Sequence, residues 1–266
     1  MQELDLDRII SDYNRDGYVA GVPILTAEET ASHRKRLEDA EAKAGPMHYQ
    51  SNVHTILTSA AELVTHPAIL DIVVQMIGPN ILLHNSTFII KEPRTESHVS
   101  WHQDLTFWGL SHDDQVTLWL ALSPASEESG CMRMIPGSHK NGMHRHETTE
   151  DENNVLLQGQ TVSGIDESGA RMAPLAPGEA SFHHGWTLHA SMPNNSDDRR
   201  IGLNVQYLAT HVRQTKHDLD TAILVRGVDE YHNFKPAKFA TTDLDPAAVQ
   251  LQEDMDKLYR ETAGTM

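Results

Sequence analysis

The chain has 266 residues and a formal net charge of −17, because 38 Asp and Glu residues outnumber 21 Lys and Arg residues. This charge repels phosphate groups, which argues against nucleic acid and anionic membrane surfaces as partners. Cys131 is the single cysteine, so an intrachain disulfide is excluded. The acidic opening lacks a signal-peptide pattern, and no apolar run is long enough for a membrane helix. We therefore expect a cytoplasmic protein.

Helical patterns dominate the first third of the chain. Residues 6–15 carry apolar side chains at helical spacing and end at Asp16-Gly17, and a short strand is expected over 18–25. Thr26 and Glu29 have the spacing of a capping box, which predicts a helix over 27–43. A further helix is predicted over 67–77, where Pro67 opens the segment and Gly78 follows it.

From residue 80 onward, short apolar or alternating runs divided by turn residues predict an antiparallel β architecture. The candidate strands cover 81–90, 98–104, 115–122, 131–135, 156–160, 179–182, 187–191 and 200–208. Strands in this number without helices between them favour two facing sheets. The predicted fold is therefore mainly β with flanking helices, a double-stranded β-helix of the jelly-roll, cupin-like kind.

We expect a single domain over 1–266, because a β fold of this length is commonly one domain. Its helices lie mainly in 1–78, its jelly-roll core spans about 80–210, and 211–266 form a C-terminal extension. Within that extension, 243–265 favour a helix that packs on the barrel or on a partner chain. The polar segment 144–154 is interpreted as a mobile loop beside the barrel mouth.

His102 and Asp104 are the first candidates for chemistry. Residues two apart on an extended strand share a face, so this imidazole and this carboxylate can bind one metal ion side by side. The flanking Trp101, Leu105 and Phe107 favour burial, where an unpaired charge is costly and a metal ion neutralises it. Two ordinary surface residues are the alternative. With a distal histidine, the set becomes the 2-His-1-carboxylate arrangement of non-heme Fe(II) oxygenases.

Three histidines, His183, His184 and His189, compete for the distal position. His189 shares a strand face with Ser191, and Arg200 lies 11 positions beyond it. The strand that Arg200 opens alternates apolar residues with polar or small ones, namely Arg200, Gly202, Asn204 and Gln206. An arginine directed into a barrel needs a carboxylate or phosphate partner, and a structural salt bridge is the alternative.

Further motifs accompany these residues: Asp16-Gly-Tyr-Val19, Ile135-Pro-Gly-Ser-His-Lys140, Pro177-Gly-Glu179 and His189-x-Ser191-x-Pro-Asn194. With Trp101-His102-Gln-Asp104 and Arg200, they make most of the chain resemble the phytanoyl-CoA dioxygenase (PhyH-like) family of Fe(II)/2-oxoglutarate-dependent oxygenases. The resemblance implies that His102, Asp104 and His189 ligate iron. It also implies that Arg200, helped by Ser191, binds the distal carboxylate of 2-oxoglutarate.

The resemblance adds weaker candidates. Trp119 matches a family tryptophan that packs beside the cosubstrate, although a plain core aromatic fits equally well. Asn85 and Lys91 lie on the strand where family members often place polar cosubstrate contacts, and a solvated strand end is the alternative for Lys91. Halogenating relatives replace the iron-binding carboxylate with a small residue, so Asp104 favours hydroxylation over halogenation.

The resemblance thus implies an Fe(II)- and 2-oxoglutarate-dependent dioxygenase that uses O2 and hydroxylates a small polar metabolite, with release of succinate and CO2. Desaturation, cyclisation and epimerisation remain open with the same cofactors. A cupin-type metal enzyme without 2-oxoglutarate would not need Arg200 and Ser191, and a non-catalytic binding protein would need no intact triad. The sequence leaves the oligomeric state open, and the acyl-CoA substrate of the family name is not transferred.

Overall fold

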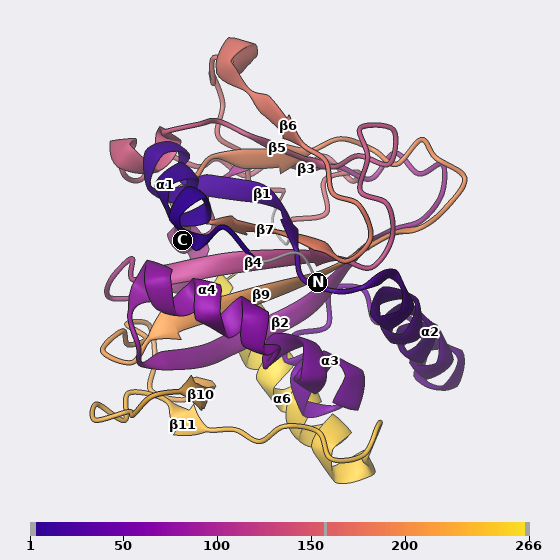
Figure 1. Cartoon of the computed structure of the whole chain (residues 1–266), viewed down its shortest axis with the longest axis vertical. Coiled ribbons are helices and arrows are strands. Elements are labelled where there is room, and N and C mark those ends of the chain that lie inside the picture. Colours follow the sequence, from indigo (N-terminus) through magenta and orange to yellow (C-terminus); the bar gives the residue numbers. More distant parts are fainter. Residues whose placement is uncertain (1–3, 157–158, 264–266) are drawn as a thin grey trace.

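A large, mostly antiparallel sheet runs through the centre of the computed structural model, which describes residues 4–156 and 159–263 (Figure 1). Its strands follow the order β1-β7-β4-β9-β2-β10-β11. Their bounds are β1 (Tyr18–Pro23), β7 (Glu179–His183), β4 (Gln115–Ala121), β9 (Arg200–Ala209), β2 (Ile81–Lys91), β10 (Thr221–Arg226) and β11 (Lys235–Pro236). Among these pairs, β10 and β11 run parallel. The early strand β1 joins the sheet at its edge, beside β7.

A smaller sheet accompanies the large one and carries the strands that position the site (Figure 1). It contains β3 (Val99–His102), β8 (His189–Ser191), β5 (Met132–Met134) and β6 (Arg171–Ala173), in that order. β3 and β8 are antiparallel, and their register places His102 opposite His189. The two sheets with flanking helices confirm the predicted jelly-roll fold class.

Some of the helices pack against the large sheet (Figure 1). The helices are α1 (Leu6–Asp16), α2 (Ala27–Ala44), α3 (Thr58–Val64), α4 (Pro67–Ile77), α5 (Leu105–Trp108) and α6 (Pro246–Ala263), with 3-10 turns at η1 (Val53–Thr55), η2 (Ser138–Asn141) and η3 (Glu167–Gly169). The predicted capping box is present, because the Glu29 carboxylate accepts from the Thr26 amide at 2.8 Å and the Thr26 hydroxyl accepts from the Glu29 amide at 3.2 Å. The predicted N-terminal helices are thus confirmed.

The two faces of β9 separate the hydrophobic core from the cavity. Ile201, Leu203 and Val205 are fully buried and pack in the same apolar cluster as Ile69 and Val73 of α4. Because successive residues of a strand point to opposite faces, the intervening polar residues of β9 face the other sheet. The alternation read from the sequence therefore places an apolar core on one side of the large sheet and a polar cavity on the other.

Several predicted elements differ from the structure. Residues 98–104 were expected as one strand, but β3 ends at His102 and Asp104 adopts helical angles of φ −59° and ψ −48° at the start of α5. No strand forms in the described part of 156–160, and residues 157–158 of that segment lie outside the described residues. The strands β6, β10 and β11 and the helix α3 were not predicted, because strands of two to six residues and a seven-residue helix carry little periodicity.

The C-terminal helix α6 packs on the chain's own fold, against α5 and η1. It begins later than the predicted 243–265, and residue 265 lies outside the described residues. Considered singly, none of the described helices is long and apolar enough to span a bilayer. Only α3 and α4 taken together, bent by 47° at their junction, meet that length and composition test.

Candidate active site

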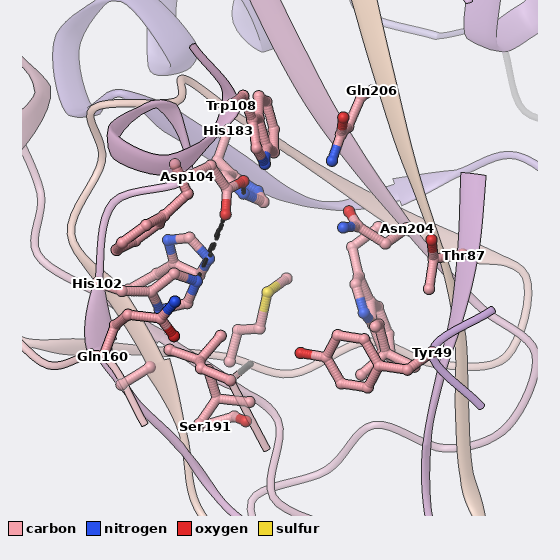
Figure 2. A pocket seen from close by; sticks show the side chains of 18 of the residues that line it. Tyr49, Thr87, His102, Asp104, Trp108, Gln160, His183, Ser191, Asn204 and Gln206 are labelled. Carbon is pink, nitrogen blue, oxygen red and sulfur yellow. Dashed lines mark hydrogen bonds and ion pairs between the residues drawn. The ribbon is translucent and has the colours of Figure 1, made fainter. Parts of the chain in front are cut away.

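A cavity of about 130 Å³ lies between the two sheets and brings most of the predicted site residues together. Figure 2 shows His102, Asp104 and His183 on one side and Tyr49, Thr87, Asn204 and Gln206 across from them. His189, Ser191, Trp119 and Arg200 also line it. We call the first side the triad end and the second, comprising Tyr49, Thr87, Asn204 and Gln206, the polar wall.

His102, Asp104 and His189 offer three ligand atoms that lie within 4.8 Å of one another, and all three side chains are buried. The Nε2 atoms of His102 and His189 are 3.4 and 3.7 Å from Oδ1 of Asp104. Such a group of two imidazoles and one carboxylate matches the ligand set of non-heme iron sites.

Both histidines are held in the ring orientation that a metal needs. Nδ1 of His102 lies 2.9 Å from the Ser100 carbonyl oxygen, and Nδ1 of His189 lies 3.0 Å from the Thr187 carbonyl oxygen. A carbonyl oxygen only accepts, so each Nδ1 carries the proton and donates. Each Nε2 is therefore the ring nitrogen that faces Asp104 and is available to a metal ion.

The two carboxylate oxygens of Asp104 have different partners. Oδ1 faces the two ligand histidines, whereas Oδ2 accepts from the Thr117 hydroxyl at 2.9 Å and lies 3.2 Å from Nε2 of His183. Burial alone would raise the pKa of Asp104, but His189, His102 and His183 outweigh it and hold that pKa well below its usual range. The carboxylate is therefore ionised and oriented before any ion binds.

Gln103 explains why Asp104 reaches the cavity although the strand has already ended. Its amide N–H donates to Nε2 of His146 at 3.0 Å, and its side-chain amide donates to the carbonyls of Gly142 and Trp186, each at 2.8 Å. The chain is thereby anchored at the strand end and turns into α5. The prediction that His102 and Asp104 share a strand face is wrong in its geometry, because a turn brings the two side chains together.

Arg200 is a buried cation with an incomplete set of partners. Its side chain is 1% exposed, Nη1 donates to the Gly130 carbonyl at 2.7 Å, and Nε has no hydrogen-bond partner within the described residues. Burial lowers the pKa of Arg200 to about 10. A buried charge without a counterion is costly, so an anion in the cavity would stabilise this guanidinium.

The indole ring of Trp119 packs against the guanidinium group of Arg200. The guanidinium carbon lies 5.1 Å from the centre of the indole ring, which is within the range of a cation–π contact. A Cβ atom on Gly202 would lie 1.9 Å from that ring, so only glycine leaves room for it. Trp119 packs in a hydrophobic cluster and also lines the cavity.

Lys91 reaches the site through Ser191. Its Nζ donates to the Ser191 hydroxyl at 2.8 Å and to the Met192 carbonyl, and the side chain is 1% exposed. Burial, together with the nearby Arg200 charge, lowers the pKa of Lys91 to about 6. Asn85 accepts from the Asn52 amide at 2.8 Å and belongs to a separate small hollow. Neither Lys91 nor Asn85 lines the main cavity, so direct cosubstrate contacts by these two remain predictions.

The sequence did not single out several other residues that line the cavity. His183 was only one of three competing histidines, and Tyr49 and Tyr259 come from segments without a motif. Gln160 lines the cavity beside His102, although its segment was expected to be a strand. Their roles depend on contacts between distant segments, which local patterns do not encode.

The family model described as Phytanoyl-CoA dioxygenase (PhyH) matches residues 13–202. The chain belongs to the PhyH family. A relative from Stutzerimonas stutzeri, named "Probable alpha-ketoglutarate-dependent hypophosphite dioxygenase", is 33% identical over 160 residues, which are 59% of this chain and 56% of the relative. The chain thus spans about half the length of the curated relatives it matches.

Solved structures extend the likeness over nearly the whole chain. The PhyH-family chain superimposes on "non-heme monooxygenase; ThoJ apo" with a TM-score of 0.83 and 28% identity, covering 96% of this chain and 98% of that one. A structure titled "CytC3 with Fe(II) and alpha-ketoglutarate" gives a TM-score of 0.67 at 24% identity, covering 90% of this chain and 94% of that one. The latter likeness concerns the fold alone.

The donor set fits an iron ion of the kind that the family implies. Two imidazole nitrogens and one ionised carboxylate oxygen converge, and each donor is fixed by a second hydrogen bond on its far side. Such supporting contacts orient ligands and strengthen metal binding. The orphaned Nε of Arg200 in the same cavity fits the carboxylate of an organic acid.

Proposed function

We propose that this chain is an Fe(II)- and 2-oxoglutarate-dependent dioxygenase that uses O2, hydroxylates a small polar metabolite and releases succinate and CO2. One observation carries the proposal: a single cavity holds both the three-donor cluster and a buried arginine whose Nε has no partner among the described residues. A cupin-type enzyme without 2-oxoglutarate gives no reason for that arginine, and a binding protein gives no reason for the cluster.

One set of residues would bind the metal, and another set would bind the cosubstrate. His102, His189 and Asp104 would hold the iron, which when bound supplies the redox chemistry that couples oxidative decarboxylation of 2-oxoglutarate to attack on a C–H bond. Thr117 and His183 hold the second oxygen of Asp104, so that the carboxylate keeps its orientation. These contacts preorganise the site and limit its reorganisation.

Arg200 would pair with the distal carboxylate of 2-oxoglutarate. Its planar guanidinium suits a two-point contact, and Trp119 holds it in place from one side. Ser191, whose hydroxyl oxygen already accepts from Lys91, keeps its own proton for donation into the cavity. The buried position of all these groups excludes water from the cosubstrate and strengthens each polar contact.

The polar wall supports a polar substrate in place of a fatty acyl chain, because its side chains carry hydroxyl and amide groups. The name of the Stutzerimonas stutzeri relative makes hypophosphite a first compound to try. Hydroxylation is proposed over halogenation because Asp104 occupies the third ligand position. The single-domain organisation over 1–266 and the cytoplasmic location stay predictions from the sequence.

Anaerobic titration of the metal-free protein with Fe(II) and 2-oxoglutarate tests the proposal, with the visible charge-transfer band of the chelate as the signal. Wild type should show the band at one equivalent of each. Arg200→Ala should need a much higher 2-oxoglutarate concentration for the same band. If wild type forms no band, the proposed function is wrong.

A further inference from the structure

A chain of hydrogen-bonded side chains runs behind the polar wall and includes Gln206. Nε2 of His84 lies 2.8 Å from Oδ2 of Asp220, and Nδ1 of His84 lies 3.1 Å from Oε1 of Gln206. The amide Nε2 of Gln206 in turn donates to the Tyr259 hydroxyl at 3.2 Å. His84 and Gln206 are 4% and 3% exposed, so solvent does not compete for the contact between them.

A β-bulge places His84 in this position. The pairing of β2 with β9 is regular up to Leu83, opposite Tyr207, and resumes at Asn85, opposite Gln206, which leaves His84 as the extra residue. Bulges turn a side chain out of the regular alternation and are frequent next to active sites. Here the bulge brings the imidazole between Gln206 and Asp220.

Asp220 is fixed as an ionised partner. Its Oδ2 also accepts from the Gln214 side chain at 3.0 Å, and its Oδ1 accepts from the Thr221 amide at 2.9 Å. Burial alone would raise the pKa of Asp220, but the charge of His84 and these hydrogen bonds lower it to about 2. A carboxylate that only accepts requires Nε2 of His84 to carry a proton.

The protonation of the other ring nitrogen decides which way the Gln206 amide faces. Burial alone would lower the pKa of His84, but the Asp220 carboxylate and the hydrogen bonds to Asp220 and Gln206 outweigh burial and raise it, which favours a proton on each ring nitrogen. Nδ1 then donates to Oε1 of Gln206, which leaves the amide N–H groups for Tyr259 and the cavity. A neutral His84 would accept at Nδ1 and turn the amide around.

We propose that Gln206 is a specificity-determining residue that donates an amide N–H to an oxygen atom of the substrate, and that the His84–Asp220 pair positions it. Figure 2 shows Gln206 reaching into the cavity across from Asp104 and close to Trp108. The substrate class is therefore a small molecule with a carbonyl, hydroxyl or oxyanion oxygen at that place. An ammonium group there would face another donor. This assignment of a substrate class rests on the proposed function.

The orientation of the amide is tested without turnover. Histidine-labelled ¹⁵N protein, free of metal at pH 7, is compared with His84→Gln to identify the His84 signal. Wild type should have both ring nitrogens of His84 protonated, and Asp220→Asn should lose one of these protons. A wild-type His84 with a single ring proton would overturn the positioning role.

The substrate class is tested with three probes of one carbon skeleton: butanamide, 1-butanol and butylammonium. Each is titrated into protein loaded with Fe(II) and 2-oxoglutarate, and its affinity is read from the change in the visible band. Butanamide and 1-butanol should bind about tenfold more tightly than butylammonium. The amide N–H of Gln206 makes no hydrogen bond to an ammonium group, and an unsatisfied buried donor costs about that much binding affinity. Asp220→Asn should reduce this preference.

Gln206→Glu replaces the donor by an acceptor of nearly the same shape and should reverse the order of the probes. Gln250→Glu, at an exposed position on α6, adds the same charge away from the cavity and should keep the wild-type order. Equal binding of butylammonium by wild type, or an unchanged order in Gln206→Glu, would overturn the inference. If no visible band forms, the proposed function fails, and calorimetric titration of the metal-free protein with the same probes still decides this inference.

Discussion

The triad end and the polar wall of the cavity are built in different ways. At the triad end, two ligands come from paired strands, β3 and β8, and the third follows within two residues of the first. The polar wall instead draws on β2, β9 and the segment around Tyr49, and α6 adds Tyr259 beside Gln206. The difference indicates that the reaction is encoded in short motifs, whereas selectivity depends on how distant segments pack.

The largest effect is expected from removing a ligand at the triad end. His189→Ala should abolish the iron-dependent visible band and reduce succinate formation to background, because the remaining two donors hold the ion too weakly. His184→Ala is the matched control, since this neighbouring histidine lies 4.0 Å from Asp113 and does not line the cavity. Retained activity in His189→Ala would show that the metal lies elsewhere.

Arg200→Lys tests the cosubstrate position between the two regions. A lysine keeps the charge but loses the planar fork and the contact with Trp119, so two-point binding of a carboxylate is lost. We expect the KM for 2-oxoglutarate to rise about 30-fold, from about 2 kcal/mol of lost binding. Steady-state kinetics at saturating Fe(II) measure it, and an unchanged KM would contradict the assignment.

The triad end and the polar wall also differ in how well the sequence predicts them. The fold class and the helices α1, α2 and α4 could be predicted because capping residues, glycines and apolar spacing are local signals. His102, Asp104, His189 and Arg200 could be identified by motif. Even there, the turn at Gln103 was missed, since its cause is a set of hydrogen bonds to residues about 40 and 80 positions away.

The polar wall could be predicted only where strand alternation reveals it. Asn204 and Gln206 appeared as inward residues of β9, whereas Tyr49 and Tyr259 did not stand out. Both tyrosines come from segments whose positions are set by tertiary contacts, and the bulge at His84 interrupts the regular period of β2. An alternating sequence pattern cannot indicate which residue of a strand forms a β-bulge.

A smaller effect is expected at the contacts between α6 and the segment around Tyr49, which belongs to the polar wall. Asp256 accepts from the Ser51 amide at 2.8 Å and pairs with Arg260, which donates to the Tyr49 carbonyl at 2.7 Å. Tyr49 itself has a φ of 60°, a conformation that non-glycine residues rarely adopt without support. Asp256→Ala should lower the free energy of unfolding by about 1.5 kcal/mol and weaken substrate binding, while the iron band persists.

Urea unfolding and the Fe(II)/2-oxoglutarate titration measure both parts of this prediction. Glu253→Ala, on an exposed position of the same helix, is the control and should leave both unchanged. Loss of the iron band in Asp256→Ala would mean that the wall and the triad end are not separable.

The smallest effect is expected far from both regions. Thr26→Ala removes the capping box of α2 and should lower the free energy of unfolding by about 1 kcal/mol. Because α2 contributes no cavity residue, the midpoint of the Fe(II)/2-oxoglutarate titration should stay the same. A shifted midpoint would show coupling between the outer helix and the site.

A crystal structure of the protein prepared without oxygen, with Fe(II) and 2-oxoglutarate, would show both binding positions at once. We expect iron bonded to Nε2 of His102, Nε2 of His189 and the Asp104 carboxylate. We also expect the distal carboxylate of 2-oxoglutarate against the guanidinium of Arg200. Iron held by other residues, or 2-oxoglutarate away from Arg200, would contradict this assignment.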